Sequence, residues 1–150
     1  MKVIDYSAKV AISIFCGADV AQAARLMRDQ HVGFLVVHRE GDDLRRPLGV
    51  LTDRDIVLEV TACGIDPRSV TVEDVMTRDP LTARDSDELS DVLQTMRREG
   101  VRRVPVVDSR GALVGIIAID DLVGIVAGLI CDMAGSIRTE QRREWRSRVA

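Results

Sequence analysis

The stretch GVLTDRD at residues 49–55 recurs in altered form as GIIAIDD at residues 115–121, and this recurrence divides the chain. Aligning the two stretches places Gly49 on Gly115 and Asp55 on Asp121. Upstream, matching residues of 3–37 align with those of 72–106. The copies differ in length in the polar loop after Arg39, which is longer in the first copy. Because turn loops tolerate insertions, the sequence indicates two copies of one unit.

Each copy predicts the order β-α-β-β-α. Apolar residues at i, i+3, i+4 and i+7 indicate the first helix, and β-branched runs indicate buried strands. The expected elements of the first copy are a strand at 11–15, a helix starting at 18–19, strands at 33–38 and 48–51, and a helix at 53–61. Those of the second are a strand at 81–83, a helix starting at 86–87, strands at 103–107 and 113–118, and a helix at 120–130.

The expected fold class is α/β (α+β), with two repeats packed in pseudo-twofold symmetry and a C-terminal helical tail. The expected boundaries are repeat 1 at 1–68, repeat 2 at 69–130 and the tail at 131–150. A unit of about 60 residues buries too little surface to be stable alone, so the copies are expected to share one core. Such a pair creates two related clefts where small ligands can bind.

Composition excludes several classes of function. The chain has 150 residues, of which 46% are apolar, and 21 basic against 24 acidic residues give a net charge of −3. A general nucleic-acid binder would show a basic excess, so a nucleic-acid partner is not expected. With four aromatic residues, stacking of bases on rings is not the expected mode of recognition, and adenine would sit against aliphatic side chains and backbone.

The three cysteines form no C-x-x-C pair, and the two histidines are too few for most metal or triad chemistry. The N-terminus has no apolar signal segment. The most apolar stretch, 112–131, is split by Asp120 and Asp121 into pieces too short to span a bilayer. We therefore expect a soluble cytoplasmic protein with reduced thiols, no metal site and no membrane partner.

Thr52 and Asp55 allow two interpretations. Thr52 stands where a helix N-cap belongs, and Asp55 follows three residues later, so the pair predicts a capping box. The same hydroxyl and carboxylate, fixed at a helix start, can also hydrogen-bond to the diol of a ribose. Local physical chemistry alone favours the cap. Gly49, before them, allows a close approach of two backbones.

The repeat, the pattern G-h-x-T-x-x-D (h, apolar) and the segment VEDVMT at 72–77 together resemble the CBS domain family. Two tandem copies form a CBS pair, or Bateman module, and TDRDIVLEVTACGIDP at 52–67 resembles stand-alone bacterial two-CBS proteins, including hypoxia-responsive ones. The resemblance implies a regulatory module that binds an adenosine-containing ligand between the repeats and signals to a partner protein. Candidate ligands are AMP, ADP, ATP, NAD and S-adenosylmethionine, with no required cofactor. It also implies a homodimer formed through the helices of both repeats.

The resemblance also implies two sites. In site A, Thr52 and Asp55 would hold the ribose, and arginines would meet phosphates. The other implied residues of site A are Arg54, Met76, Leu81, Val101, Arg102 and Arg103. Those of site B are Ile12, Val32, Gly33, Ala118 and Asp121. Site B departs from the family pattern, because Ala118 replaces the threonine and Gly33 stands where site A has Arg102. The missing ribose hydrogen bond costs roughly 0.5–1.5 kcal/mol, so site B is expected to be the weaker site.

An enzyme is not expected, because no nucleophile–base arrangement, phosphate loop or metal cluster is recognisable. The alternative function is a ligand-independent dimeric scaffold in which Thr52 and Asp55 only cap a helix. The tail at 138–148 carries five arginines and two glutamates, a net +3 that leaves 1–137 at −6. It predicts either a solvated helix or a docking tail anchored by Trp145.

Overall fold

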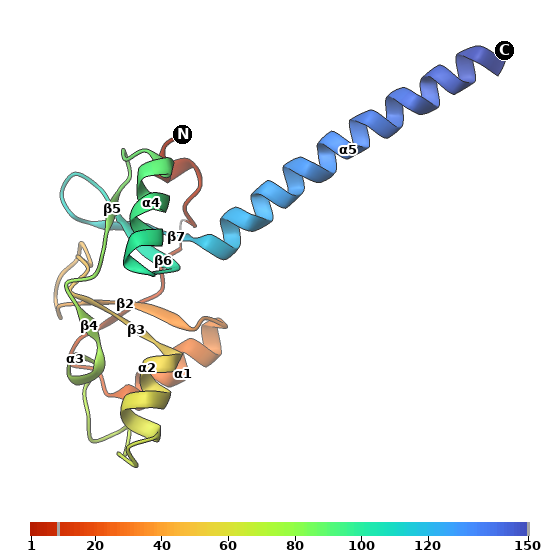
Figure 1. Cartoon of the computed structure of the whole chain (residues 1–150). Coiled ribbons are helices and arrows are strands. Elements are labelled where there is room, and N and C mark those ends of the chain that lie inside the picture. Colours follow the sequence, from red (N-terminus) through yellow and green to blue (C-terminus); the bar gives the residue numbers. More distant parts are fainter. Residues whose placement is uncertain (9, 150) are drawn as a thin grey trace. The chain divides into compact units, whose positions relative to one another are not determined.

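The computed structural model describes residues 1–8 and 10–149. Its chain forms two compact units, residues 1–117 and 118–150. The first unit contains a four-stranded sheet in the order β1-β2-β3-β4 and a three-stranded sheet in the order β5-β6-β7 (Figure 1). In the first sheet β1 runs parallel to β2, whereas β2–β3 and β3–β4 are antiparallel.

The predicted element order is confirmed in both repeats. The elements of the first repeat are β1 (Ser13–Phe15), α1 (Val20–Gln30), β2 (Phe34–His38), β3 (Gly49–Thr52), α2 (Asp53–Asp55) and the π-helical turn η2 (Ile56–Thr61). Those of the second are β5 (Ala83–Arg84), α4 (Leu89–Glu99), β6 (Arg103–Val107), β7 (Leu113–Ala118) and α5 (Ile119–Val149). A short segment precedes each repeat: η1 (Val3–Asp5) before the first, and α3 (Val72–Val75) with β4 (Thr77–Arg78) before the second.

The helix starts differ in their capping. At α1 the Asp19 carboxylate accepts from the Gln22 amide at 2.7 Å, which matches the predicted acidic start. At α4 the N-cap is Glu88, without a side-chain cap, so the start lies beyond the predicted 86–87. Asp87 instead accepts from the backbone N–H of Arg84 at 2.8 Å. A hydrogen bond within the turn before α4 therefore takes the place of the expected helix cap.

The two segments that precede the repeats are exchanged between them. Residues 70–76 pack on the first repeat, where Val72 N donates to Ala18 O at 2.8 Å. The N-terminal segment packs on the second repeat, where Val3 N donates to Asp87 O at 3.0 Å. The repeat alignment places Val3 on Val72 and Ala18 on Asp87, so these are the same bond in the two copies. We call residues 1–8 and 70–78 the exchanged segments; in Figure 1 the first runs beside α4.

The exchanged segments also extend both sheets at equivalent places. Thr77 pairs with Val50 on β3, and Ala8 pairs with Ile116 on β7. The contact requires glycine beneath it in each copy. A Cβ on Gly49 would lie 2.9 Å from the Thr77 carbonyl oxygen, and a Cβ on Gly115 would lie 2.7 Å from that of Ala8. The predicted close backbone approach at Gly49 is therefore confirmed.

Strand β2 joins the cores of the two repeats. Leu35 and Val37 belong to the apolar cluster of the first repeat, which also contains Val72 from the exchanged segment. Phe34 and Val36 lie in a second cluster together with Leu113 of the second repeat. All four of these β2 residues are buried. This burial on both faces explains the continuous apolar run of β2 and confirms the expected shared core.

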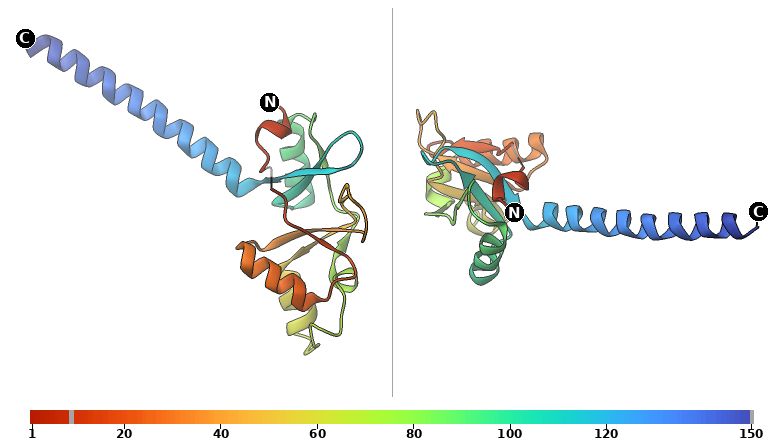
Figure 2. Two further views of the ribbon diagram at one scale, coloured as in Figure 1. Left: turned by 180° about the vertical axis from the view of Figure 1, so that it is seen from behind. Right: turned by 90° about the horizontal axis from the view of Figure 1, so that it is seen from above.

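The second unit is a single helix, α5, without interruption at position 131 (Figure 2). Its segment Ile119–Arg142 is long and apolar enough to cross a membrane, judged by length and composition only. The expectation that Asp120 and Asp121 leave only short apolar pieces was therefore wrong, because the helix begins beside them and continues past residue 131. Such a segment is a weak indication of a membrane span, and the expectation of no membrane partner remains a prediction.

The exchange predicts two equivalent anchors. Val3 and Val72 are both fully buried, so Val3→Ala and Val72→Ala should each lower the free energy of unfolding by about 2–3 kcal/mol. Val10→Ala is the matched control, because Val10 is 76% exposed. Urea unfolding of the three variants measures the difference. A loss for Val3→Ala no larger than that for Val10→Ala would contradict the docking of the N-terminal segment.

An ion pair at this docking site predicts a pH dependence. The Lys2 ammonium lies 2.7 Å from Glu88 and, with the terminal ammonium, lowers the pKa of Glu88 from 4.5 to about 2. Because the folded pKa is lowered, Glu88 stabilises the fold above about pH 4.5 and loses this contribution as the pH falls toward 2. The difference in unfolding free energy between the wild type and Glu88→Gln should shrink over that range. Lys2→Met should make this difference depend less on pH. If the difference between the wild type and Glu88→Gln stays the same from pH 6 to pH 2, the ion pair does not contribute to stability.

Candidate functional site

A cavity of about 420 Å³ lies between the two repeats, within the first unit. One wall comes from the first repeat, at the starts of β2 and α2 and along β3, with Thr77 of β4. The other wall is the end of α4 and the turn into β6. The lining residues are Gly33, Phe34, Val50, Thr52, Asp53, Arg54, Asp55, Thr77, Gly100, Val101, Arg102 and Arg103. Six of the eight residues expected for site A are thus brought together: Thr52, Arg54, Asp55, Val101, Arg102 and Arg103.

Thr52 and Asp55 form the predicted capping box. The Thr52 hydroxyl oxygen accepts from the Asp55 amide at 3.1 Å, and the Thr52 amide donates to Asp55 Oδ2 at 2.8 Å. Both side chains are half-buried at the cavity wall. The cap uses the oxygen of Thr52 as an acceptor, so its hydroxyl proton can still be donated. It uses one carboxylate oxygen of Asp55, and Oδ1 is left to accept. Capping and ribose binding are therefore compatible.

Gly33 and Asp53 meet at the cavity wall. A Cβ on Gly33 would lie 2.6 Å from Asp53 Oδ2, so no side chain fits there while Asp53 keeps its position. Asp53 also donates its backbone N–H to the Gly33 carbonyl at 3.1 Å, and its Oδ1 accepts from the Arg54 amide at 2.8 Å. Gly33 was expected in site B, whereas the structure places it in the cavity that holds the site A residues.

The arginines of the cavity come from both repeats. Arg54 lies in the first turn after β3, and Arg102 and Arg103 follow the left-handed residue Gly100, which ends α4 at φ 68°. The turn directs the chain from the helix into β6 along the cavity. Arg54, Arg102 and Arg103 are exposed. With two aspartates in the same lining, the charges sum to +1, which favours an anion of modest charge.

Several lining residues were missed by the sequence analysis. Val50 stands two residues before Thr52, and alternation along a strand could have placed it on the same face. Gly100 marks the helix end just before Val101, a signal that was also available. Phe34 contributes an aromatic ring, although it is largely buried. The expectation of purely aliphatic and backbone surroundings for adenine is therefore incomplete. Thr77 ends the recognised segment VEDVMT, but that segment gives no sign of a place in the cavity, because Thr77 reaches it through the segment exchange.

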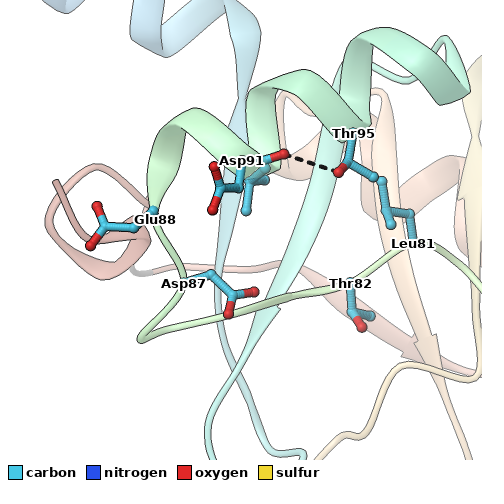
Figure 3. Close-up of a pocket in the computed structure, with 7 residues that line it drawn as sticks. Leu81, Thr82, Asp87, Glu88, Asp91 and Thr95 are labelled. Atoms are coloured by element: carbon cyan, nitrogen blue, oxygen red, sulfur yellow. Dashed lines mark hydrogen bonds between the residues drawn. The ribbon is translucent and has the colours of Figure 1, made fainter.

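Two expected residues of site A lie elsewhere. Met76 is buried in the core of the first repeat, with its sulfur against Gly49. Leu81 lines a separate cleft of about 350 Å³ at the start of α4 (Figure 3). Three carboxylates, those of Asp87, Glu88 and Asp91, line the same cleft, and the Thr95 hydroxyl donates to the Asp91 carbonyl at 3.0 Å. This acidic cleft is unfavourable for a phosphate.

The residues expected for site B belong to both compact units. Ile12 and Val32 are partly buried and pack against the core of the first repeat. Ala118 ends β7, and Asp121 lies in the first turn of α5. Neither Ile12 nor Val32 lines the cavity described above. The weaker affinity expected of site B remains a prediction.

Among the residues that the structure describes, no three His, Cys, Asp or Glu side chains group as metal ligands. His31 is exposed and ends α1 in the left-handed conformation at φ 54°, a conformation that costs most residues about 1–2 kcal/mol. It is the counterpart, in the first repeat, of Gly100 in the second. Its position is that of a helix cap, and it does not line the cavity.

The pattern of the CBS domain matches residues 3–62 and 72–128, which is most of the chain. The chain belongs to the CBS domain family. CBS domains are typically regulatory, not catalytic. The chain is 38% identical over 120 residues to the CBS domain-containing protein YhcV of Bacillus subtilis, covering 80% of each. It is 29% identical over 120 residues to the protein MK0525 of Methanopyrus kandleri, covering 80% of this chain and 60% of that protein.

Solved CBS structures match the fold. CBS protein PAE2072 of Pyrobaculum aerophilum, solved with AMP, has a TM-score of 0.74 at 27% identity, covering 81% of this chain and 90% of that one. The CBS pair of MJ0100, solved with 5′-methylthioadenosine and S-adenosylmethionine, has a TM-score of 0.72 at 25% identity, covering 85% of this chain and 97% of that one. Hypoxic Response Protein I, solved with two zinc ions, has a TM-score of 0.71 at 28% identity, covering 82% of this chain and 97% of that one. The chain is thus a tandem CBS pair, a fold that holds adenosine ligands in PAE2072 and MJ0100.

Proposed function

We propose that this CBS pair is a regulatory module that binds an adenosine-containing ligand in the cavity between its repeats and signals to a partner protein. The observation that carries the proposal is that one cavity joins Thr52 and Asp55 of the first repeat to Arg102 and Arg103 of the second. The adenosine ligands of the neighbouring structures support the same class of ligand. AMP fits best, because the lining has a small positive charge.

Eight of the twelve lining residues have a role in this proposal. Thr52 donates its hydroxyl proton to a ribose oxygen, and Asp55 accepts from the diol through Oδ1. Val50 and Val101 supply apolar surface for the base, next to the edge of Phe34. Arg102 and Arg103 meet the phosphate, and Arg54 of the first repeat adds a third positive charge to the same lining. Because these groups belong to both repeats, bound ligand ties the repeats together, and this is the change that a partner would sense.

The alternative is a scaffold that binds no ligand. It is favoured by the complete capping box, which gives Thr52 and Asp55 a structural role of their own. In both functions the chain is expected to form a homodimer. Val57 and Leu58 on η2 support this expectation, because they are 55% and 47% exposed on one of the helices through which CBS pairs are expected to dimerise.

Asp55 provides the test between the two functions. AMP should raise the melting temperature of the wild type, because binding to the folded state alone stabilises by about 2.7 kcal/mol at a hundred times Kd. Asp55→Ala should abolish the AMP shift while the protein still folds. Asp74→Ala is the matched control, because Asp74 also accepts from the amide of a threonine three residues before it, Thr71, at 2.8 Å, but does not line the cavity. No shift with AMP, ADP, ATP, NAD or S-adenosylmethionine at millimolar concentration would favour the scaffold.

Arg102 provides the test for the phosphate. Arg102→Met keeps the apolar stem and removes the charge, so the affinity for AMP should fall about tenfold to a hundredfold, as expected for a hydrogen bond to a charged group. The affinity for adenosine, which has no phosphate, should not change. Arg97→Met on α4 is the control, because Arg97 is exposed and does not line the cavity. Isothermal titration measures both ligands, and equal losses for AMP and adenosine would refute a phosphate contact.

A further inference from the structure

An apolar stripe follows one side of α5. Its residues recur at alternating spacings of four and three, the spacing of helix–helix seams. They are Ile119, Val123, Val126, Ile130, Met133 and Ile137. The last five are each more than half exposed, between 54% and 69%. The opposite side of the helix carries small and polar residues, among them Gly124, Gly128, Asp132 and Gly135. Leu129 and Ile125, which are 59% and 40% exposed, flank the stripe and widen the apolar side. An exposed apolar side of this extent needs a partner.

The charges of the segment are separated along its length. Asp120 and Asp121 lie in the first turn, and Arg138, Glu140 and Arg142 follow the last residue of the stripe, with a net charge of +1. Beside a parallel copy, acidic ends would meet and basic ends would meet. Beside an antiparallel copy, each acidic end meets a basic end, and the two helix dipoles oppose each other. The stripe and the charges thus fit one arrangement of two identical helices.

A bilayer fits this segment less well. Asp132 stands in the middle of the apolar window, and a central aspartate costs about 2.5–3.5 kcal/mol on insertion scales. The polar side contains aspartates and glycines between residues 120 and 137, whereas helices that lie on anionic membranes carry lysine and arginine there. A second copy of α5 leaves Asp132 in water and buries only the stripe.

We propose that α5 pairs antiparallel with α5 of a second copy of this chain along the apolar stripe. Matching the stripe to itself sets the register: Val126 faces Ile130 of the partner, Val123 faces Met133, and Ile119 faces Ile137. In this register the acidic first turn of one helix lies within reach of Arg138 of the other. In this register the two helices overlap over residues 119–137, roughly 28 Å at 1.5 Å per residue. The proposal goes beyond ligand binding and does not depend on it.

Disulfide cross-linking tests both the pairing and its direction. The full chain is used with its three cysteines replaced, Cys63 and Cys131 by serine and the half-buried Cys16 by alanine. Val123→Cys and Met133→Cys are made separately in this background, mixed and oxidised with glutathione. Antiparallel pairing predicts at least ten times more cross-linked dimer in the mixture than in either variant alone. If Val123→Cys alone cross-links as well as the mixture, the helices are parallel and the proposal fails.

A matched pair of charge substitutions tests the stripe. Ile130→Glu, added to both cysteine variants, should reduce the cross-link at least tenfold. Ile125→Glu is the control, because Ile125 is on the same helix and 40% exposed but lies off the stripe. It should leave the cross-link unchanged, and equal effects of the two substitutions would refute the assigned face. Sedimentation with vesicles of phosphatidylglycerol and phosphatidylcholine tests whether a membrane binds the stripe instead. Vesicle binding without a cross-link in the mixture would overturn the proposal, as would the absence of both.

Discussion

The reciprocal exchange of two short segments is the constraint on which the first unit depends. Neither repeat has enough chain to cover its own sheet, because each lacks the strand and the buried valine that the other repeat's leading segment supplies. Val3 and Val72 fill equivalent places, and Gly49 and Gly115 allow the backbones to approach at both. The two repeats therefore fold as one body. The cavity between them has walls that neither repeat could build alone.

The hydrogen bonds between Thr52 and Asp55 cap α2 and also fix two polar side chains in the cavity lining. A capping box fixes the rotamers of a hydroxyl and a carboxylate at the start of a helix, so in the proposed function these groups would need no reorganisation to meet a ligand. Asp74 likewise accepts from the Thr71 amide, at 2.8 Å, and also from the Thr71 hydroxyl, at 2.7 Å, but neither residue lines the cavity. A sequence motif of this kind identifies the cap in both places. Only the surroundings distinguish the position that faces Arg102 and Val101 from the position that faces solvent.

Charge is distributed unevenly between the two units. The first unit holds the candidate site, whose lining balances three arginines against two aspartates. The second is a helix that is acidic at its start, apolar in its middle and basic at its end. The net −3 of the whole chain conceals this arrangement. The proposed antiparallel pairing accounts for it, since opposite ends of two copies then neutralise each other.

Much of this protein could be predicted from its sequence. The repeat, the order of strands and helices, the shared core and the group of Thr52, Asp55 and the arginines follow from periodicity, local capping chemistry and a family pattern, all of which depend on neighbouring residues. The tertiary structure decided what depends on contacts between distant residues. The segment exchange places Thr77 in the cavity and Met76 in the core of the first repeat, and Leu81 lies in a separate acidic cleft. No local pattern encodes these positions, because each results from two backbones that meet from distant parts of the chain.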